Sequence, residues 1–139
     1  MIAGKFVEAP GANVKLPVRQ TQGSAGYDFY APEKIVLEPN GARMFNTGVV
    51  ADIEQGYVLL LFPRSGLGMK GVRIANTVGV IDSDYKLEIC CKLVNDSNES
   101  IIIEKGDRYM QGVFVKFGIV ENDEPVSKER KGGMGSTGV

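Results

Sequence analysis

Residues 42–62 read ARMFNTGVVADIEQGYVLLLF, and this stretch decides the fold class. Its two apolar segments, residues 42–53 and 57–62, lack the sustained apolar period of a helix. The residues between them, Glu54-Gln55-Gly56, include a glycine that tolerates left-handed backbone. The stretch therefore predicts two β-strands with a hairpin connection between them.

The same pattern extends to both sides of this stretch. Eighteen glycines and six prolines divide the chain into short segments that are rich in Val, Ile, Tyr and Phe. The clusters Pro39-Asn40-Gly41 and 95–98 are expected to form two further hairpin connections. The predicted strands are residues 6–7, 13–17, 25–30, 35–37, 42–53, 57–62, 72–75, 86–93, 100–103 and 109–117. So many short strands in 139 residues predict one all-β domain, a sandwich or barrel of the jelly-roll kind.

The composition changes near Glu121. Residues 121–139 read ENDEPVSKERKGGMGSTGV, with many charges, four glycines and few apolar side chains that could pack into a core. We therefore expect residues 1–120 to form the β-domain and residues 121–139 to form a flexible C-terminal arm.

Charge and composition exclude several classes of protein. Sixteen basic and seventeen acidic residues leave a formal charge of −1, which gives no general field for stable nucleic-acid or membrane binding. The first ten residues, MIAGKFVEAP, lack the charged and apolar regions of a secretory signal, and no window has the apolar length of a membrane helix. A cytoplasmic location is expected, in the cell or in a host cell if the gene is viral.

The residue types also limit the chemistry. The chain has no histidine, which excludes Ser-His-Asp and Cys-His catalysis and every histidine-based metal site. Its two cysteines, Cys90 and Cys91, are adjacent, so they are poor disulfide partners and too few for a zinc site. Hydrolytic chemistry would rest on carboxylates, with a hard metal ion as a candidate cofactor.

Two glycine-containing segments are candidate anion-binding sites. In residues 131–138, KGGMGSTG, exposed backbone amides and hydroxyl groups could wrap phosphate oxygens, with Arg130 adding a charge-assisted bond. In residues 63–68, PRSGLG, a strand ends in a turn where Arg64 offers a planar fork and Ser65 a small donor. The alternatives are a disordered tail for the first segment and a structural turn with a surface arginine for the second.

Two further segments carry carboxylates. Residues 76–85, NTVGVIDSDY, place two aspartates and a tyrosine at a turn, where a carboxylate beside bound phosphate could activate a water molecule. In residues 26–31, GYDFYA, Asp28 interrupts an aromatic strand. The alternatives are ordinary turn-forming aspartates and a solvent-facing strand position.

In this order, the segments resemble the five motifs of the trimeric dUTPase family. The matching segments are GYDFYA (26–31), PRSGLG (63–68), NTVGVIDSDY (76–85), GDRYMQGVF (106–114) and RKGGMGSTG (130–138). The resemblance implies a jelly-roll-like distorted β-barrel with a flexible glycine-rich arm. It also implies hydrolysis of dUTP to dUMP and pyrophosphate by attack of water on the α-phosphorus, with Mg²⁺ as cofactor.

The resemblance assigns roles to individual residues. Asp82 is the implied catalytic base, and Tyr85 is expected to pack against the deoxyribose and exclude a 2′-hydroxyl. The strand pair around Val80 and Cys90 is expected to read uracil through backbone groups. Asp28 is expected to hold magnesium through water, while the substrate phosphates hold most of the ion. The implied substrate-binding residues are Arg64, Ser65, Gly66, Asn76, Val80, Ile81, Asp82, Tyr85, Cys90, Gln111, Arg130, Met134, Gly135, Ser136 and Thr137.

By the same resemblance the protein is a homotrimer whose three sites are each built from three chains, with the arm closing over a site formed mainly by the others. Three positions depart from the family pattern. Met134 replaces an aromatic residue that covers uracil, Arg130 lies one residue nearer the glycines, and Leu87 replaces a glycine.

Two other functions fit parts of the pattern. A dCTP deaminase shares the fold, although GVIDSDY (79–85) and the short chain resemble the pyrophosphatase form. A regulatory protein with this fold could instead bind a protein partner, as yet unknown, in a nucleotide-dependent way.

Overall fold

The structure is a computed structural model that describes residues 1–130. Strands dominate this part of the chain, and one short helix, α1 (Ser65–Met69), interrupts them. The strands are β1 (Gly4–Glu8), β2 (Tyr27–Tyr30), β3 (Ile35–Leu37), β4 (Ala42–Asn46), β5 (Val49–Ile53), β6 (Tyr57–Pro63), β7 (Val72–Ile74), β8 (Gly79–Ile81), β9 (Cys90–Asn95), β10 (Ile101–Ile103) and β11 (Arg108–Lys116). The prediction of an all-β fold is confirmed, and α1 is far too short to cross a membrane.

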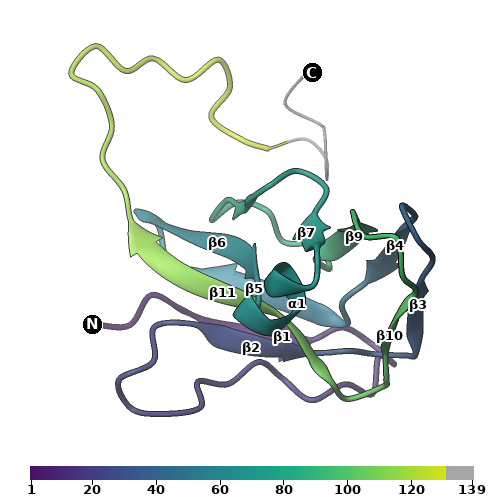
Figure 1. Cartoon of the computed structure of the whole chain (residues 1–139). Helices are drawn as coiled ribbons and strands as arrows, with labels where there is room; N and C mark the ends of the chain where they lie inside the picture. Colours follow the sequence, from purple (N-terminus) through teal and green to yellow (C-terminus); the bar gives the residue numbers. More distant parts are fainter. Residues whose placement is uncertain (131–139) are drawn as a thin grey trace.

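The strands form four small sheets in which every pair is antiparallel (Figure 1). The largest sheet has the order β2-β11-β6-β8, so the last strand within residues 1–130 lies in its interior. The others are β4-β9-β7, β1-β5 and β10-β3. Most strands pair with strands distant in the sequence, as the jelly-roll kind of fold requires.

Alternation along the strands creates the core. In β6, Leu59 and Leu61 are buried while Leu60 and Phe62 are half-buried, which is the period of two expected for a strand with one face in the interior. Phe29 and Met110 add to the same interior face from β2 and β11. This face holds the sheets together through apolar burial.

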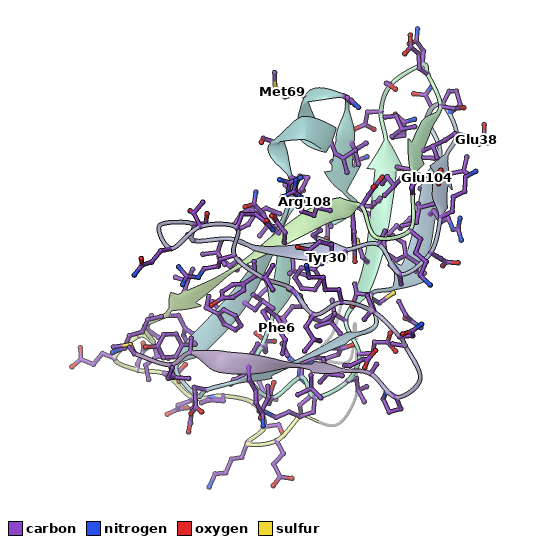
Figure 2. The ribbon with its side chains drawn as sticks, turned by 90° about the horizontal axis from the view of Figure 1, so that it is seen from below. Phe6, Tyr30, Glu38, Met69, Glu104 and Arg108 are labelled. Carbon is purple, nitrogen blue, oxygen red and sulfur yellow. The ribbon has the colours of Figure 1, made fainter. Side chains whose placement is uncertain are left out.

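The N-terminal strand is anchored by an aromatic cluster. Phe6 of β1 lies with its ring centroid 5.4 Å from Tyr27, 5.8 Å from Phe29 and 5.5 Å from Phe114. Figure 2 shows Phe6 directed from β1 toward the body of the molecule. Edge-on aromatic packing of this kind attaches β1 to the largest sheet.

The three predicted hairpin connections are turns, but none of them joins a hairpin. At Gly56, with φ of 91°, the chain passes from β5, which pairs with β1, to β6, which pairs with β11 and β8. The turns after β3 and β9 likewise connect strands of different sheets. Turn residues fix a local reversal, whereas the pairing partner is decided by long-range packing.

Three predicted strands also differ from the structure. Residues 13–17 form no strand, because Asn13 has a φ of 50° and Pro17 lacks an amide donor. Residues 42–53 divide into β4 and β5 at Gly48, where φ is 80°. The first part of 86–93 is a loop. The strand β8 and the helix α1 were not predicted, since each is only a few residues long.

Candidate functional site

A pocket of about 350 Å³ lies between β8 and the start of β9. Its walls are mainly apolar, and its size suits a small molecule. The pocket is lined by Met44, Leu61, Ile74, Ala75, Asn76, Gly79, Val80, Ile81, Cys90, Cys91, Lys92 and Met110. Four of the predicted site residues, Asn76, Val80, Ile81 and Cys90, therefore meet in one cavity.

The two strands at this pocket are splayed apart. The expectation that Val80 and Cys90 belong to one strand pair is wrong, because β8 pairs with β6 whereas β9 pairs with β4 and β7. No strand pairing joins β8 to β9 within residues 1–130. Backbone groups at the facing edges of the two strands are consequently available to a ligand that enters between them.

A strained turn positions Asn76 at the pocket. Thr77 has a φ of 71°, which is unusual for a β-branched residue. The Val78 amide donates to the Asn76 carbonyl at 2.8 Å across this residue, and the Thr77 amide donates to the Ile74 carbonyl at 2.8 Å. Non-glycine residues with positive φ gather at functional sites, where surrounding structure sustains the strain.

The loop after β8 carries Asp82 and Tyr85. The Tyr85 amide donates to the Asp82 carbonyl at 3.1 Å, so both residues belong to one tight turn. The Tyr85 hydroxyl donates to the Glu88 carbonyl at 2.8 Å, which fixes the far end of the ring. Burial, followed by the nearby Cys90 thiol, raises the pKa of Tyr85, so the hydroxyl stays a hydrogen-bond donor at neutral pH.

The side chain of Arg130 contacts this loop from a distant part of the sequence. Its Nε donates to Asp84 Oδ1 at 2.8 Å, a second guanidinium nitrogen pairs with Asp82 Oδ2, and the group lies 5.9 Å from the centre of the Tyr85 ring. The hydrogen bond to Asp84 is the main reason that the pKa of Arg130 is raised. Arg130 is thus placed beside the predicted base. The other predicted arm residues, Met134, Gly135, Ser136 and Thr137, lie outside the described residues.

A second group of predicted residues forms around Asp28. This residue is only 6% exposed, and its Oδ1 accepts from Arg64 Nε at 3.0 Å. Arg108 Nη1 lies 3.9 Å from the other carboxylate oxygen, Oδ2. Gln111 is the cross-strand neighbour of Asp28, and its amide donates to the Pro63 carbonyl at 3.3 Å. Asp28 therefore orients the guanidinium of Arg64.

Ser65 and Gly66 follow Arg64 at the exposed start of α1. No side chain of residues 1–130 caps this helix end, so their amides are available for an anion. Figure 2 shows Arg108 near the base of α1, whose Met69 points away from the body of the molecule. The backbone donors and the cationic groups thus lie in one region.

The largest sheet separates the two groups. Leu61 and Met110 line the pocket, whereas the next residues, Phe62 and Gln111, are cross-strand neighbours whose side chains point to the opposite face. Gln111 and Asp28 share that opposite face. Within one copy of the chain, the Asp28 group therefore lies across this sheet from the pocket residues Leu61 and Met110.

The surroundings of Asp28 determine how this residue could help to hold a magnesium ion. Among residues 1–130 no cluster of three or more His, Cys, Asp or Glu side chains could hold a metal ion. Asp28 already binds Arg64, so direct coordination would compete with a buried ion pair. Its second oxygen suits a bond from a metal-bound water, which fits an ion that keeps its hydration shell and is held mainly by phosphates.

Comparison with known proteins identifies the family. The dUTPase family model matches residues 12–138. The chain belongs to the dUTPase family. It is 41% identical to the deoxyuridine 5′-triphosphate nucleotidohydrolase of Nautilia profundicola over 128 residues, covering 88% of this chain and 90% of the relative.

Solved structures of dUTPases have the same fold. The dUTPase of Streptococcus mutans superposes with a TM-score of 0.74 at 33% identity, covering 84% of this chain and 98% of the other. The dUTPase of Staphylococcus bacteriophage 80alpha, solved with dUPNHPP, gives a TM-score of 0.73 at 30% identity over the whole of both chains. The expected jelly-roll-like dUTPase fold is thereby confirmed.

Sequence reasoning missed several residues of this candidate site. Met44 and Lys92 line the pocket as a cross-strand pair, and Arg108 lies on Asp28. Arg108 stands in the fourth motif, where its position near Gln111 was an available signal. Met44 lies outside every motif, so only the pairing of β4 with β9 brings it to the site.

Proposed function

We propose that this chain hydrolyses dUTP to dUMP and pyrophosphate by attack of water on the α-phosphorus, with Asp82 as the general base. The observation that carries the proposal is the pocket between the splayed strands, which opens beside the loop of Asp82 and Tyr85. This reaction keeps uracil out of DNA and supplies dUMP. It would take place in the cytoplasm, of the cell or of a host cell.

The base would enter between β8 and β9. Uracil presents an acceptor at its 4-position where cytosine presents a donor, so backbone groups of residues 79–81 and 90–91 can distinguish them. The apolar walls exclude water from the ring. Because the donors and acceptors are main-chain groups, the side chain of Cys90 contributes contact area but does not determine which base is bound.

Tyr85 would select the sugar. Its ring is held at both ends, by the turn with Asp82 and by the hydroxyl bond to Glu88. A fixed ring against the deoxyribose leaves no room for a 2′-hydroxyl and offers it no partner, which discriminates against UTP.

The phosphates would be held by Arg64, Ser65, Gly66 and Gln111 of another subunit, together with Arg130 and residues 134–137 of the arm. Arg130 is paired with Asp82 and Asp84, so binding requires its guanidinium to exchange carboxylate for phosphate. That exchange frees the Asp82 carboxylate to accept a proton from the attacking water.

Magnesium would be held by the substrate phosphates and, through water, by Asp28. When bound, the ion supplies charge neutralisation at the triphosphate. Arg64 of the neighbouring subunit then positions the phosphate oxygens, and its ion pair with the largely buried Asp28 holds the guanidinium in place.

A homotrimer would bring the two groups of residues together. The outer face of the largest sheet carries an apolar row across three strands, made of Val113, Leu60 and Val80, and Val80 is 58% exposed. Residues 1–130 of a single chain leave this row partly exposed, and apolar surface of this kind marks interfaces between subunits. The same face holds Asp28 and Gln111, which must reach a pocket on a neighbouring copy.

The test is pyrophosphate release from dUTP, with dCTP, dTTP and UTP as controls, in Mg²⁺ and then in EDTA. Activity confined to dUTP is expected, with a loss on chelation and a loss of about 10²–10⁴-fold in Asp82→Asn. Asp52→Asn, on an exposed ion pair with Lys86, is the matched control and should stay active. Folded wild type without dUTP turnover would contradict the proposal, and ammonia release from dCTP would indicate the deaminase.

A further inference from the structure

A four-bond clamp holds the loop behind Tyr85. We define the clamp as residues 47–49, which connect β4 to β5, together with Glu88 and Ile89. The Thr47 amide and hydroxyl both donate to the Ile89 carbonyl, at 2.9 and 2.7 Å. The Ile89 amide donates to the Val49 carbonyl at 2.9 Å, and the Gly48 amide donates to Glu88 Oε2 at 2.7 Å.

The clamp rests on rigid parts of the protein. Thr47 and Ile89 are fully buried, and Val49 is nearly so. Gly48 has a φ of 80°, and a Cβ at this position would lie 2.7 Å from Val14 Cγ1, so glycine is required on both grounds. Removing the Thr47 hydroxyl is costly, because the Ile89 carbonyl keeps only its bond from the Thr47 amide and the buried Val49 amide loses Thr47 Oγ1 as its acceptor at 3.2 Å.

The clamp leads directly to the pocket. Glu88, which binds Gly48 through its side chain, accepts the Tyr85 hydroxyl bond through its backbone carbonyl. On the other side of Ile89, Cys90 begins the pocket wall on β9. The clamp therefore fixes both the ring beside the sugar and one edge of the base pocket.

We propose that Thr47 and Glu88 are positioning residues that set the selectivity for a 2′-deoxyribose, by holding the Tyr85 ring in place. The inference rests on the proposed function, in which Tyr85 packs against the sugar. Steric exclusion of one hydroxyl group works only if the ring cannot retreat. Loss of the Thr47 hydroxyl bond or of the Glu88 side-chain bond lets residues 85–88 move, so that the pocket admits a ribose.

Two matched pairs of variants test the inference. Thr47→Val keeps the shape and removes the hydroxyl, whereas Thr47→Ser keeps it; Glu88→Ala removes the acceptor, whereas Glu88→Gln keeps one. The readout is the ratio of kcat/KM for dUTP to kcat/KM for UTP. This ratio should fall roughly tenfold in Thr47→Val and Glu88→Ala and stay within about twofold of wild type in Thr47→Ser and Glu88→Gln.

If the role of these residues were merely structural, kcat/KM would fall equally for dUTP and for UTP, and their ratio would not change. That result would overturn the inference. Equal damage in the conservative variants would also overturn it. Far-UV circular dichroism and sizing check that each variant is folded. If Thr47→Val does not fold, Glu88→Ala decides, because Glu88 is only half-buried. Wild type is assayed in parallel, so absence of dUTP turnover there would count against the proposed function instead.

Discussion

At the scale of single residues, Gly26 shows why the first motif begins with a glycine. A Cβ at this position would meet Gln111 Oε1, the side chain whose amide binds the Pro63 carbonyl. Gly26→Ala should displace Gln111 and lower kcat/KM for dUTP by roughly tenfold, with little change in unfolding, since the displaced group is the end of a flexible side chain.

Steady-state kinetics together with urea denaturation would check this expectation. The control is Gly23→Ala, because a Cβ at Gly23 has no neighbour within 4 Å. Full activity in Gly26→Ala would mean that Gln111 does not bind substrate in the conformation described.

Cys91 gives a prediction on pH. Burial raises the pKa of its thiol from 9.0 to about 12. The unfolded chain therefore loses this proton before the folded one, and stability falls as the pH rises from 9 toward 12. The contribution to the slope approaches about 1.4 kcal/mol per pH unit.

In Cys91→Ala the free energy of unfolding should fall less steeply as the pH rises from 9 toward 12, although the substitution lowers stability at pH 7 through the cavity it leaves. Urea denaturation at a series of pH values with a reductant present measures the slope. Cys90→Ala is the comparison and should flatten it less, because Cys90 is only half-buried. Identical slopes in wild type and Cys91→Ala would refute the assignment.

How far the sequence predicts the site depends on the residue. Asp82 and Tyr85 lie in one short motif, and their shared turn is a local property. Thr47 and Glu88 have no such signal, since the bond from Gly48 to Glu88 spans 40 positions and arises only when the domain is assembled. Local motifs thus name the groups that we propose to touch substrate, whereas the groups that hold them in place come from the packing.

At the scale of elements, β11 depends on a glycine. A Cβ on Gly112 would lie 2.9 Å from Leu59 Cδ1 and 3.2 Å from Leu61 Cδ2, both on the neighbouring strand β6. Gly112→Ala should lower the free energy of unfolding by about 1–3 kcal/mol through overpacking. Thermal and urea denaturation measure the loss.

Gly118→Ala is the matched control, because this glycine follows β11 and a Cβ there has no neighbour within 4 Å. A neutral Gly112→Ala would indicate that Leu59 and Leu61 can repack.

The elements also show the limit of reading strands from sequence. The apolar segments around residues 35–37, 57–62 and 109–117 were predicted to within two residues at each end. The pairing was not, because turns such as 54–56 specify a reversal of the chain and carry no information on which strand will lie beside it. β8 escaped prediction because Gly79–Ile81 is shorter than any reliable period.

At the scale of the whole molecule, the proposed trimer rests on the outer face of the largest sheet. Leu60→Lys places a charge in the row formed with Val113 and Val80. The chain should remain folded but sediment as a monomer, in place of an assembly of three times 15.0 kDa. Turnover should be lost with assembly, since the pocket and the Asp28 group would no longer meet.

Analytical ultracentrifugation and dUTP hydrolysis are measured on the same samples. Ile102→Lys is the control, because Ile102 is 56% exposed on β10, away from this face. A monomeric Leu60→Lys protein with full activity would show that one chain contains a complete site.

The position of β11 has a consequence for biosynthesis. Of the strands in residues 1–130 this one is made last, yet it lies between β2 and β6 and provides a partner for both. Until residues 108–116 have left the ribosome, β2 and β6 present open edges that could pair with strands of other chains. The largest sheet therefore cannot be completed before residues 108–116 are available, and the growing chain would depend on chaperones or on fast completion to avoid aggregation.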